Sequence, residues 1–142
     1  MSRSSRRSAL AAAFGLLLAA ASTGNALAQR EPAAPPALQA EFRTFVADFR
    51  KALRANDASA VAALTRLPIY YDDAHRDRAY FESRIYRQMF TQRNRTCLQT
   101  ARPVYDKDGE GNENFFLFCG QTIFVFTKKA DGFRFEGTHP ND

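Results

Sequence analysis

The sequence predicts an α+β fold in which N-terminal helices pack on a curved antiparallel sheet. Between residues 37 and 91, apolar side chains recur at helical spacing. After residue 95, short β-prone segments alternate with turn residues. Helices followed by a meander of strands are typical of domains whose helices cover one face of a sheet. The chain of 142 residues has room for one such domain.

Residues 1–28 have the three parts of a secretory signal peptide. Three arginines precede an uncharged run over residues 9–21, and Ala26-Leu27-Ala28 is a small-x-small cleavage signature. We therefore expect cleavage after Ala28 and a periplasmic or secreted protein. The uncharged run is shorter than the roughly 20 residues of a membrane-spanning helix, so no stable membrane anchor is expected. The adjacent Arg6 and Arg7 leave the export route open between the general and twin-arginine pathways.

Removal of the signal peptide changes the charge balance of the chain. The full sequence has 20 Lys and Arg against 15 Asp and Glu, a net charge of +5. The remaining 114 residues carry a net charge of only +2, with acidic and basic side chains interleaved. This balance argues against a nucleic-acid partner.

The exported part begins with a Pro-rich stretch at residues 29–36, which is predicted to form an extended tether before a single domain at 37–142. A long amphipathic helix is predicted over residues 37–56. Asp57 is placed to cap a second, shorter helix that reaches residue 67, just before a proline.

A third helix is predicted over residues 79–91, after a β-prone segment at 69–71 and a highly charged loop at 72–78. The charges of the loop continue without an apolar periodicity, which is typical of a solvated connection.

Four short β-prone segments fill the rest of the chain. Residues 96–105 are expected to pair with 114–119, and residues 122–127 with 133–136. Gly120 allows two interpretations, a tight turn between two strands or a bulge within one long strand.

Cys97 and Cys119 are the only cysteines, and an even pair in a small exported domain predicts a disulfide. A hairpin loop with Gly109 in the left-handed conformation and Asp106 opposite Glu110 would place the two cysteines directly opposite each other on neighbouring strands. A competing register turns on Glu110 and Gly111, offsets the two cysteines by about four residues and would need a bulge to restore the pair.

The densest cluster of functional groups lies in the charged loop. Asp72, Asp73 and His75 are the candidate catalytic residues, because adjacent carboxylates beside an imidazole can support proton transfer. The same groups are also cation ligands, but no metal-binding spacing accompanies them, so neither a metal nor a cofactor is expected. The simpler interpretation is a solvated loop, since charged residues continue to Arg78.

The exported part contains 12 Phe and 5 Tyr. Most are expected in the core, because a small domain without Trp needs other large side chains to fill its interior. Large apolar groups occupy both faces of the predicted strands, so the second face of the sheet is expected to be covered or to meet a partner. The candidates for a pocket rim or an interface are Tyr70, Tyr71, Tyr86, Tyr105, Phe116 and Phe118.

Several segments carry a family resemblance. They are the long first helix, the helix end at residues 62–68, the helix with Phe81, Tyr86 and Phe90, and the terminal strand at 132–135. In this order they resemble the small exported bacterial members of the NTF2-like superfamily, whose cone-shaped fold wraps a bent sheet around a helical lid. Cystatin-like folds are the nearest structural alternative. The resemblance implies a pocket at the mouth of the cone, but no residue set matches the catalytic residues of the isomerases and dehydratases in that superfamily.

We therefore expect a non-catalytic exported module for binding or assembly. Its partner would be a small apolar ligand in the cone or a protein against the sheet, including a second copy of the chain. The alternative is a small-molecule isomerase, dehydratase or hydrolase that uses Asp72, Asp73 or His75. Burial discriminates between the two, because the enzyme needs an ionisable group in the cavity, such as a buried Asp with a His or Tyr partner.

Overall fold

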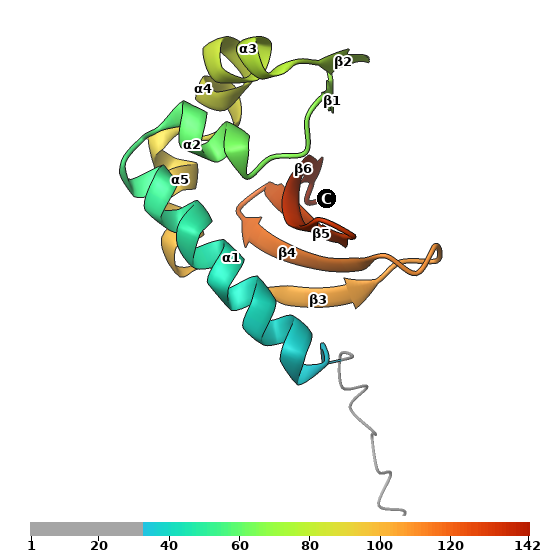
Figure 1. Cartoon of the computed structure of the whole chain (residues 1–142). Coiled ribbons are helices and arrows are strands. Elements are labelled where there is room, and N and C mark those ends of the chain that lie inside the picture. Colours follow the sequence, from blue (N-terminus) through green and yellow to red (C-terminus); the bar gives the residue numbers. More distant parts are fainter. Residues whose placement is uncertain (1–32) are drawn as a thin grey trace, which may run out of the picture.

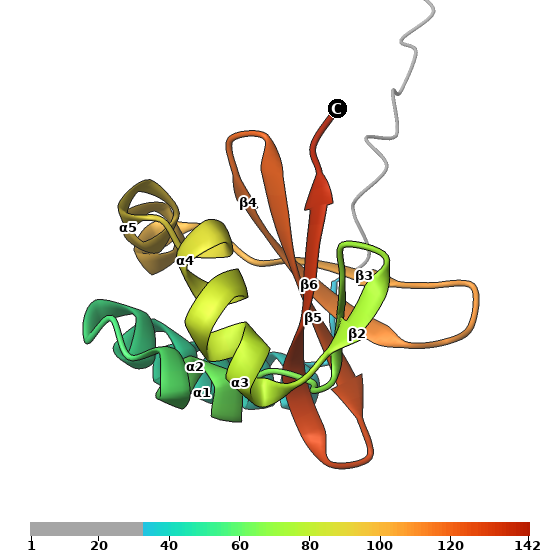
Figure 2. The same ribbon diagram turned by 90° about the horizontal axis from the view of Figure 1, so that it is seen from above.

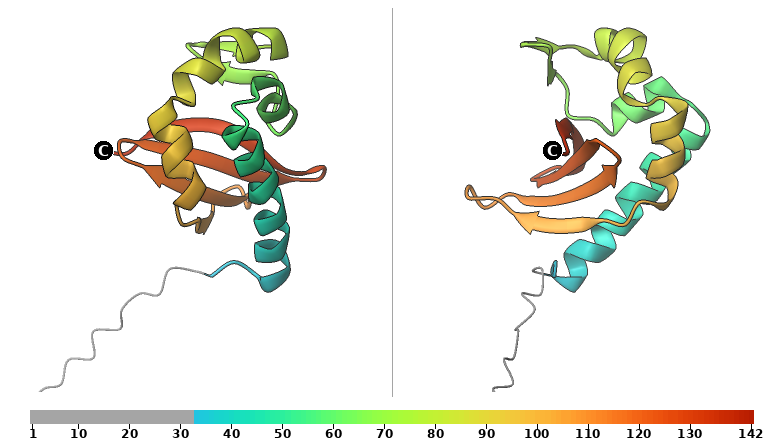
Figure 3. Two further views of the ribbon diagram at one scale, coloured as in Figure 1. Left: turned by 90° about the vertical axis from the view of Figure 1, so that its left-hand side faces the viewer. Right: turned by 180° about the vertical axis from the view of Figure 1, so that it is seen from behind.

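The computed structural model describes residues 33–142, and the predicted signal peptide and residues 29–32 of the predicted tether lie outside this range. Helices precede a four-stranded antiparallel sheet, which confirms the predicted α+β class (Figure 1). In the left view of Figure 3, α1 (Pro36–Arg54) and α5 (Gln92–Thr100) cross in front of the sheet. The helices therefore cover one face of the sheet.

Helix α1 is the predicted long helix, and it begins one residue earlier, at a proline whose fixed φ suits the first helical turn. Phe42 stacks on Phe115 of the sheet, with ring centroids 4.1 Å apart. Phe49 meets Phe126 edge-to-face at 5.1 Å. The apolar stripe of α1 thus packs on the sheet, and its buried residues are Phe42, Val46, Phe49, Ala52 and Leu53.

Helix α2 (Ala58–Ala63) begins where the sequence predicted, because the Asp57 carboxylate accepts a hydrogen bond from a backbone N–H of the first turn. It ends earlier than predicted. The chain leaves the helix to reach the edge of the sheet, where the Phe135 N–H donates to the carbonyl of Leu64 and the Arg66 N–H donates to the carbonyl of Phe135.

The third predicted helix is confirmed as a continuous helical segment over residues 78–89. It consists of α3 (Arg78–Tyr80), a π-helical turn (Phe81–Ile85) and α4 (Tyr86–Met89). The segment lies beside α2 (Figure 2), on the side of the molecule away from β3 and the N-terminal end of α1 (Figure 1).

The predicted charged loop is in part a β-hairpin. β1 (Ile69–Tyr71) pairs with β2 (Ala74–Arg76), a strand that the sequence analysis did not predict. Asp72 and Asp73 form the two-residue turn, with φ values of 51° and 56°. Two consecutive left-handed residues are typical of a type I′ turn, and Asp tolerates this conformation better than most residues.

The region just before the sheet also differs from the prediction. Residues 92–100 form α5, where a strand was expected from residue 96 to residue 105. Thr91 caps α5 by accepting a hydrogen bond from a backbone N–H of its first turn. Only Leu98 is buried, so α5 has no apolar stripe that a sequence pattern would reveal. Two carbonyls at its C-terminal end accept hydrogen bonds from Arg50 of α1, which helps to hold the helix in place.

The four strands of the sheet follow one another in chain order, from β3 at one edge to β6 at the other. Gly120 has a φ of 63° and forms a two-residue turn with Gln121, which resolves the open alternative in favour of a turn. The strands are β3 (Val104–Lys107), β4 (Glu113–Cys119), β5 (Thr122–Lys129) and β6 (Gly132–Pro140).

The loop between β3 and β4 sets a different register from the predicted one. Asp106 pairs with Asn114, four residues further along than the favoured register placed it, which is the offset of the competing register. The Asp108 carboxylate accepts hydrogen bonds from two backbone N–H groups of the loop, and such a turn fixes where the chain reverses. The left-handed glycine is Gly111, with a φ of 85°, rather than Gly109.

The predicted disulfide between Cys97 and Cys119 is confirmed, and it joins α5 to the end of β4. The register argument for it is nevertheless wrong. Cys97 lies on a helix that packs beside the strand end, not on a strand directly opposite Cys119.

The bulge that bends the sheet lies in β6. Val125 pairs with Gly137 and Phe126 pairs with Phe135, so Glu136 is an extra residue without a partner in β5. An extra residue in one strand of an antiparallel pair bends that strand.

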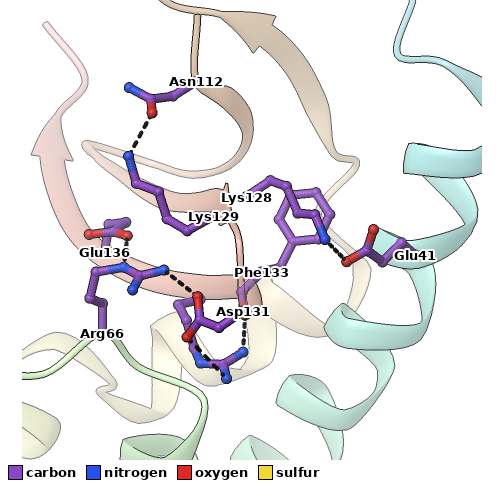
Figure 4. A network of polar contacts seen from close by, with 9 residues as sticks. Glu41, Arg66, Asn112, Lys128, Lys129, Asp131, Phe133 and Glu136 are labelled. Carbon is purple, nitrogen blue, oxygen red and sulfur yellow. Dashed lines mark hydrogen bonds and ion pairs between the residues drawn. The ribbon is translucent and has the colours of Figure 1, made fainter. Parts of the chain in front are cut away.

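A network of ion pairs connects this bulge to the segment after α2 (Figure 4). Arg66 Nε lies 2.5 Å from Glu136 Oε1, and Arg66 Nη2 lies 3.4 Å from Asp131 Oδ1. In the same view, Lys128 of β5 pairs with Glu41 of α1. Partly exposed pairs of this kind contribute little stability individually, so their main effect is to orient the elements that they join.

Candidate functional site

The structure places the predicted catalytic cluster on the exposed tip of the β1–β2 hairpin. Asp72 and Asp73 are the turn residues, and the side chains of Asp72, Asp73 and His75 are all exposed. The Tyr70 ring, 62% exposed, meets the His75 ring edge-to-face with centroids 5.4 Å apart. None of these four residues lines any of the three cavities described below.

Two further tyrosine candidates also lie outside these cavities. Tyr86 is buried in the helical layer, and its hydroxyl donates a hydrogen bond of 3.0 Å to Asn56 Oδ1. Burial raises the pKa of Tyr86. The Tyr71 hydroxyl donates to Gln88 of α4, so it fastens the hairpin to that helix.

A cavity of about 500 Å³ lies where α1 meets β3. In Figure 1, the N-terminal, blue end of α1 runs beside β3. Three buried apolar side chains, Phe42, Val46 and Phe115, contribute to its wall. Tyr105 of β3 lines the same cavity, so one of the predicted pocket residues does face a pocket.

Helix α1 also contributes polar side chains to the cavity, those of Gln39, Arg43 and Arg50. Together with Val46 they follow one another at intervals of three or four residues, which places them along one face of the helix. The Arg50 guanidinium is half-buried, and it donates hydrogen bonds of 2.8 and 2.7 Å to two carbonyls of the α5 region. Desolvation lowers the pKa of Arg50, with a further contribution from Arg54.

Tyr105, which lines this cavity, forms a polar pair with Glu113. The Tyr105 hydroxyl donates to Glu113 Oε2, and Lys107 Nζ lies 3.2 Å from Glu113 Oε1. The hydrogen bond to Glu113 raises the pKa of Tyr105, and the same bond lowers the pKa of Glu113. Both shifts move the pKa of the group further from neutral pH. A general acid or base works best with a pKa near the operating pH.

The second face of the sheet carries an apolar groove of about 380 Å³. Phe116, Phe118, Ile123 and Val104 line it, and the Phe118 side chain is 42% exposed. His139 also lines it from β6, where it pairs with Ile123. The groove brings together the two predicted interface phenylalanines.

A third, polar cavity of about 310 Å³ adjoins the groove near the β3–β4 loop. The Asp108 carboxylate, which lines this cavity, accepts hydrogen bonds from the loop itself. Hydrogen bonds from the side chain and backbone of Asn112 lower the pKa of Asp108 to about 2, and Asn114 adds another bond. The Thr127 hydroxyl donates to Asn114 Oδ1 at 2.7 Å, so these buried polar groups hold the loop on the sheet.

Sequence reasoning did not single out Arg43 and Arg50 as site residues. The amphipathic pattern of α1 assigned them to its polar faces, which are usually solvated. A weak signal was present, because the two arginines stand seven residues apart and flank Val46 on one side of the helix. Only the position of β3 shows that this side faces a cavity.

No protein-family model, curated protein or solved structure matches the chain. Among residues 33–142, no group of three or more His, Cys, Asp or Glu side chains is arranged to hold a metal ion. Within the same range, no helix combines the length and hydropathy needed to cross a bilayer.

Proposed function

We propose that this chain is an exported, non-catalytic binding module that holds a small apolar ligand in the cavity between α1 and β3. The observation that carries the proposal is the cavity itself, with a volume of about 500 Å³ and a wall that includes buried Phe42, Val46 and Phe115. Ligand pockets are commonly ~300–1,000 Å³, mostly apolar, with a few polar groups that orient the ligand.

The architecture supports this proposal at a coarser level. Helices on one face of a bent antiparallel sheet (Figure 1) are compatible with an NTF2-like cone. The lining residues of the cavity come from the long helix, from the edge strand β3 and from the chain next to them. The signal-peptide pattern of residues 1–28 and the Cys97–Cys119 disulfide both favour export to an oxidising compartment.

The enzyme alternative has less support. Its candidate residues, Asp72, Asp73 and His75, are exposed on a hairpin turn. No Asp, Glu or His is among the described residues that line the α1–β3 cavity. The pKa values of neighbouring Tyr105 and Glu113 move away from neutrality, which does not favour proton transfer through this pair.

A second candidate function is assembly of two copies through the uncovered sheet face. The observation that favours it is the exposed Phe118 in an apolar groove with Phe116 and Ile123. Light scattering at rising protein concentration tests it. A dimer that Phe118→Ser dissociates supports assembly, whereas a clean monomer at high concentration contradicts it.

A fluorescent apolar probe tests the ligand site directly. The full chain is expressed in a bacterial host, and the protein recovered from the periplasm is titrated with N-phenyl-1-naphthylamine, called the neutral probe below. We expect saturable binding of one probe per chain and a protein N-terminus at Gln29.

Two matched variants locate the probe. Val46→Phe fills the α1–β3 cavity, and Ile123→Phe makes a comparable change in the groove on the second face. We expect the first variant to lose binding and the second to keep it, with circular dichroism confirming that both are folded. Absence of saturable binding, or a loss confined to Ile123→Phe, contradicts the proposed ligand site.

A further inference from the structure

Two arginines line the α1–β3 cavity from the same side of α1. Arg43 and Arg50 are seven residues apart, about two helical turns, with the buried Val46 between them. No Asp or Glu is among the described residues that line the cavity. The polar part of this wall is therefore cationic, next to an apolar part made by Phe42 and Phe115.

Neither of these arginines forms an ion pair with a residue in the described part of the chain. Among residues 33–142, the partners of the Arg50 guanidinium are the carbonyl oxygens of Leu98 and Ala101. Other arginines in the same range do have carboxylate partners. Arg66 pairs with Glu136, and Arg78 pairs with Glu82 at 2.7 Å. The cavity thus holds positive charge that the described chain leaves uncompensated, which favours an anion there.

We infer that the ligand of this cavity is an apolar molecule with one anionic group, whose charge lies against Arg43 and Arg50 and whose body lies against Phe42, Val46 and Phe115. A guanidinium group is the side chain best suited to a carboxylate or similar oxyanion, because its planar donors match two oxygens at once. This inference rests on the proposed function, and it adds the chemical class of the ligand.

Arg43 is the residue to test. It is exposed and its side chain has no hydrogen bond to a described residue, whereas the Arg50 side chain supports α5 through two hydrogen bonds. Arg43→Gln therefore removes a cavity charge without disturbing the helix contacts. Arg84→Gln is the matched control, because Arg84 is exposed in the π-helical turn and lines none of the three cavities.

Two probes with the same aromatic body separate charge from apolar contact. The neutral probe is compared with 1-anilinonaphthalene-8-sulfonate, which carries the same rings and one sulfonate. We expect the sulfonated probe to bind about tenfold more tightly, the difference that one charge-assisted hydrogen bond typically makes. Arg43→Gln should remove most of this preference, measured as the ratio of the two affinities, whereas Arg84→Gln should leave both affinities unchanged. Raising the ionic strength should reduce the preference in the unmodified protein.

The outcomes distinguish this inference from the proposed function. Equal affinities for the two probes, or equal losses in Arg43→Gln and Arg84→Gln, overturn the inference while leaving an apolar ligand site intact. A preference for the sulfonated probe that Ile123→Phe abolishes and Val46→Phe preserves overturns it as well, because the anion then binds on the other face. Failure of the neutral probe to bind overturns the proposed function itself.

Discussion

Removal of the Cys97–Cys119 disulfide is expected to cost the protein a large part of its stability. The bridge closes a loop with a sequence separation of 22. In the chain-entropy model, a loop of this length lowers the entropy of the unfolded chain by about 11 cal/mol/K, which corresponds to ~3.4 kcal/mol at 25 °C. Leu98 is the only buried residue that α5 contributes, so few other apolar contacts hold this helix.

Urea unfolding of Cys97→Ala/Cys119→Ala measures this effect. With a slope of ~1–3 kcal/mol/M, the midpoint should fall by roughly 1–3 M. Unmodified protein treated with a reducing agent should unfold at the same midpoint as the double variant, because both lack the bridge. An unchanged midpoint refutes the reasoning, and so does a mass spectrum of the exported protein that shows two free thiols.

Three further predictions concern the loop and the core. The pKa of Asp108 is lowered to about 2, so the stability that its ionised form contributes is complete above pH ~4 and is lost as the pH falls toward ~2. Asp108→Asn should remove this part of the acid dependence, and an acid profile identical to that of the unmodified protein contradicts the loop contacts. Phe49→Ala, at a fully buried position beside Phe126, should lower the free energy of unfolding by ~3–5 kcal/mol in urea, and a loss below ~1 kcal/mol argues against the packing of α1. Gly111→Ala, at a φ of 85°, should cost about 1 kcal/mol in a thermal melt, while Gly109→Ala, without a positive φ, serves as the control.

The elements with a strong apolar periodicity could be predicted from the sequence. Helix α1 has this periodicity, and the capping carboxylate of Asp57 marked the start of α2 correctly. Helix α5 could not be predicted in the same way, because its position depends on contacts with α1 through Arg50 and on the disulfide. Tertiary contacts of this kind override local propensity.

The register of the β3–β4 hairpin shows a different limit. The loop contains several turn-forming residues, and composition alone does not decide which of them reverses the chain. Asp108 decides it, because its carboxylate accepts two backbone hydrogen bonds. The disulfide prediction is correct although the favoured register is wrong, because it also rested on the even number of cysteines and on the expected oxidising compartment.

The candidate site could be predicted only in part. Tyr105, Phe116 and Phe118 were expected near a pocket or an interface, and each lines a cavity or groove. The charged cluster at residues 72–75 had the richest chemistry in the sequence, yet the hairpin turn exposes it to solvent. The sequence indicates an ordinary surface residue at Arg43. The structure shows that β3 lies opposite this side of α1 and that the two elements together line a cavity.

The most direct test of the proposed ligand site is a map of the residues that respond to an apolar ligand. Backbone amide spectra of the isotope-labelled exported protein would be recorded during a titration with the neutral probe. We expect the largest shift changes at residues that line the α1–β3 cavity alone, including Phe42 and Val46, with little change at His75 or Ile123. Changes centred on Ile123 and Phe118, or no localised change at saturation, would contradict a ligand site between α1 and β3.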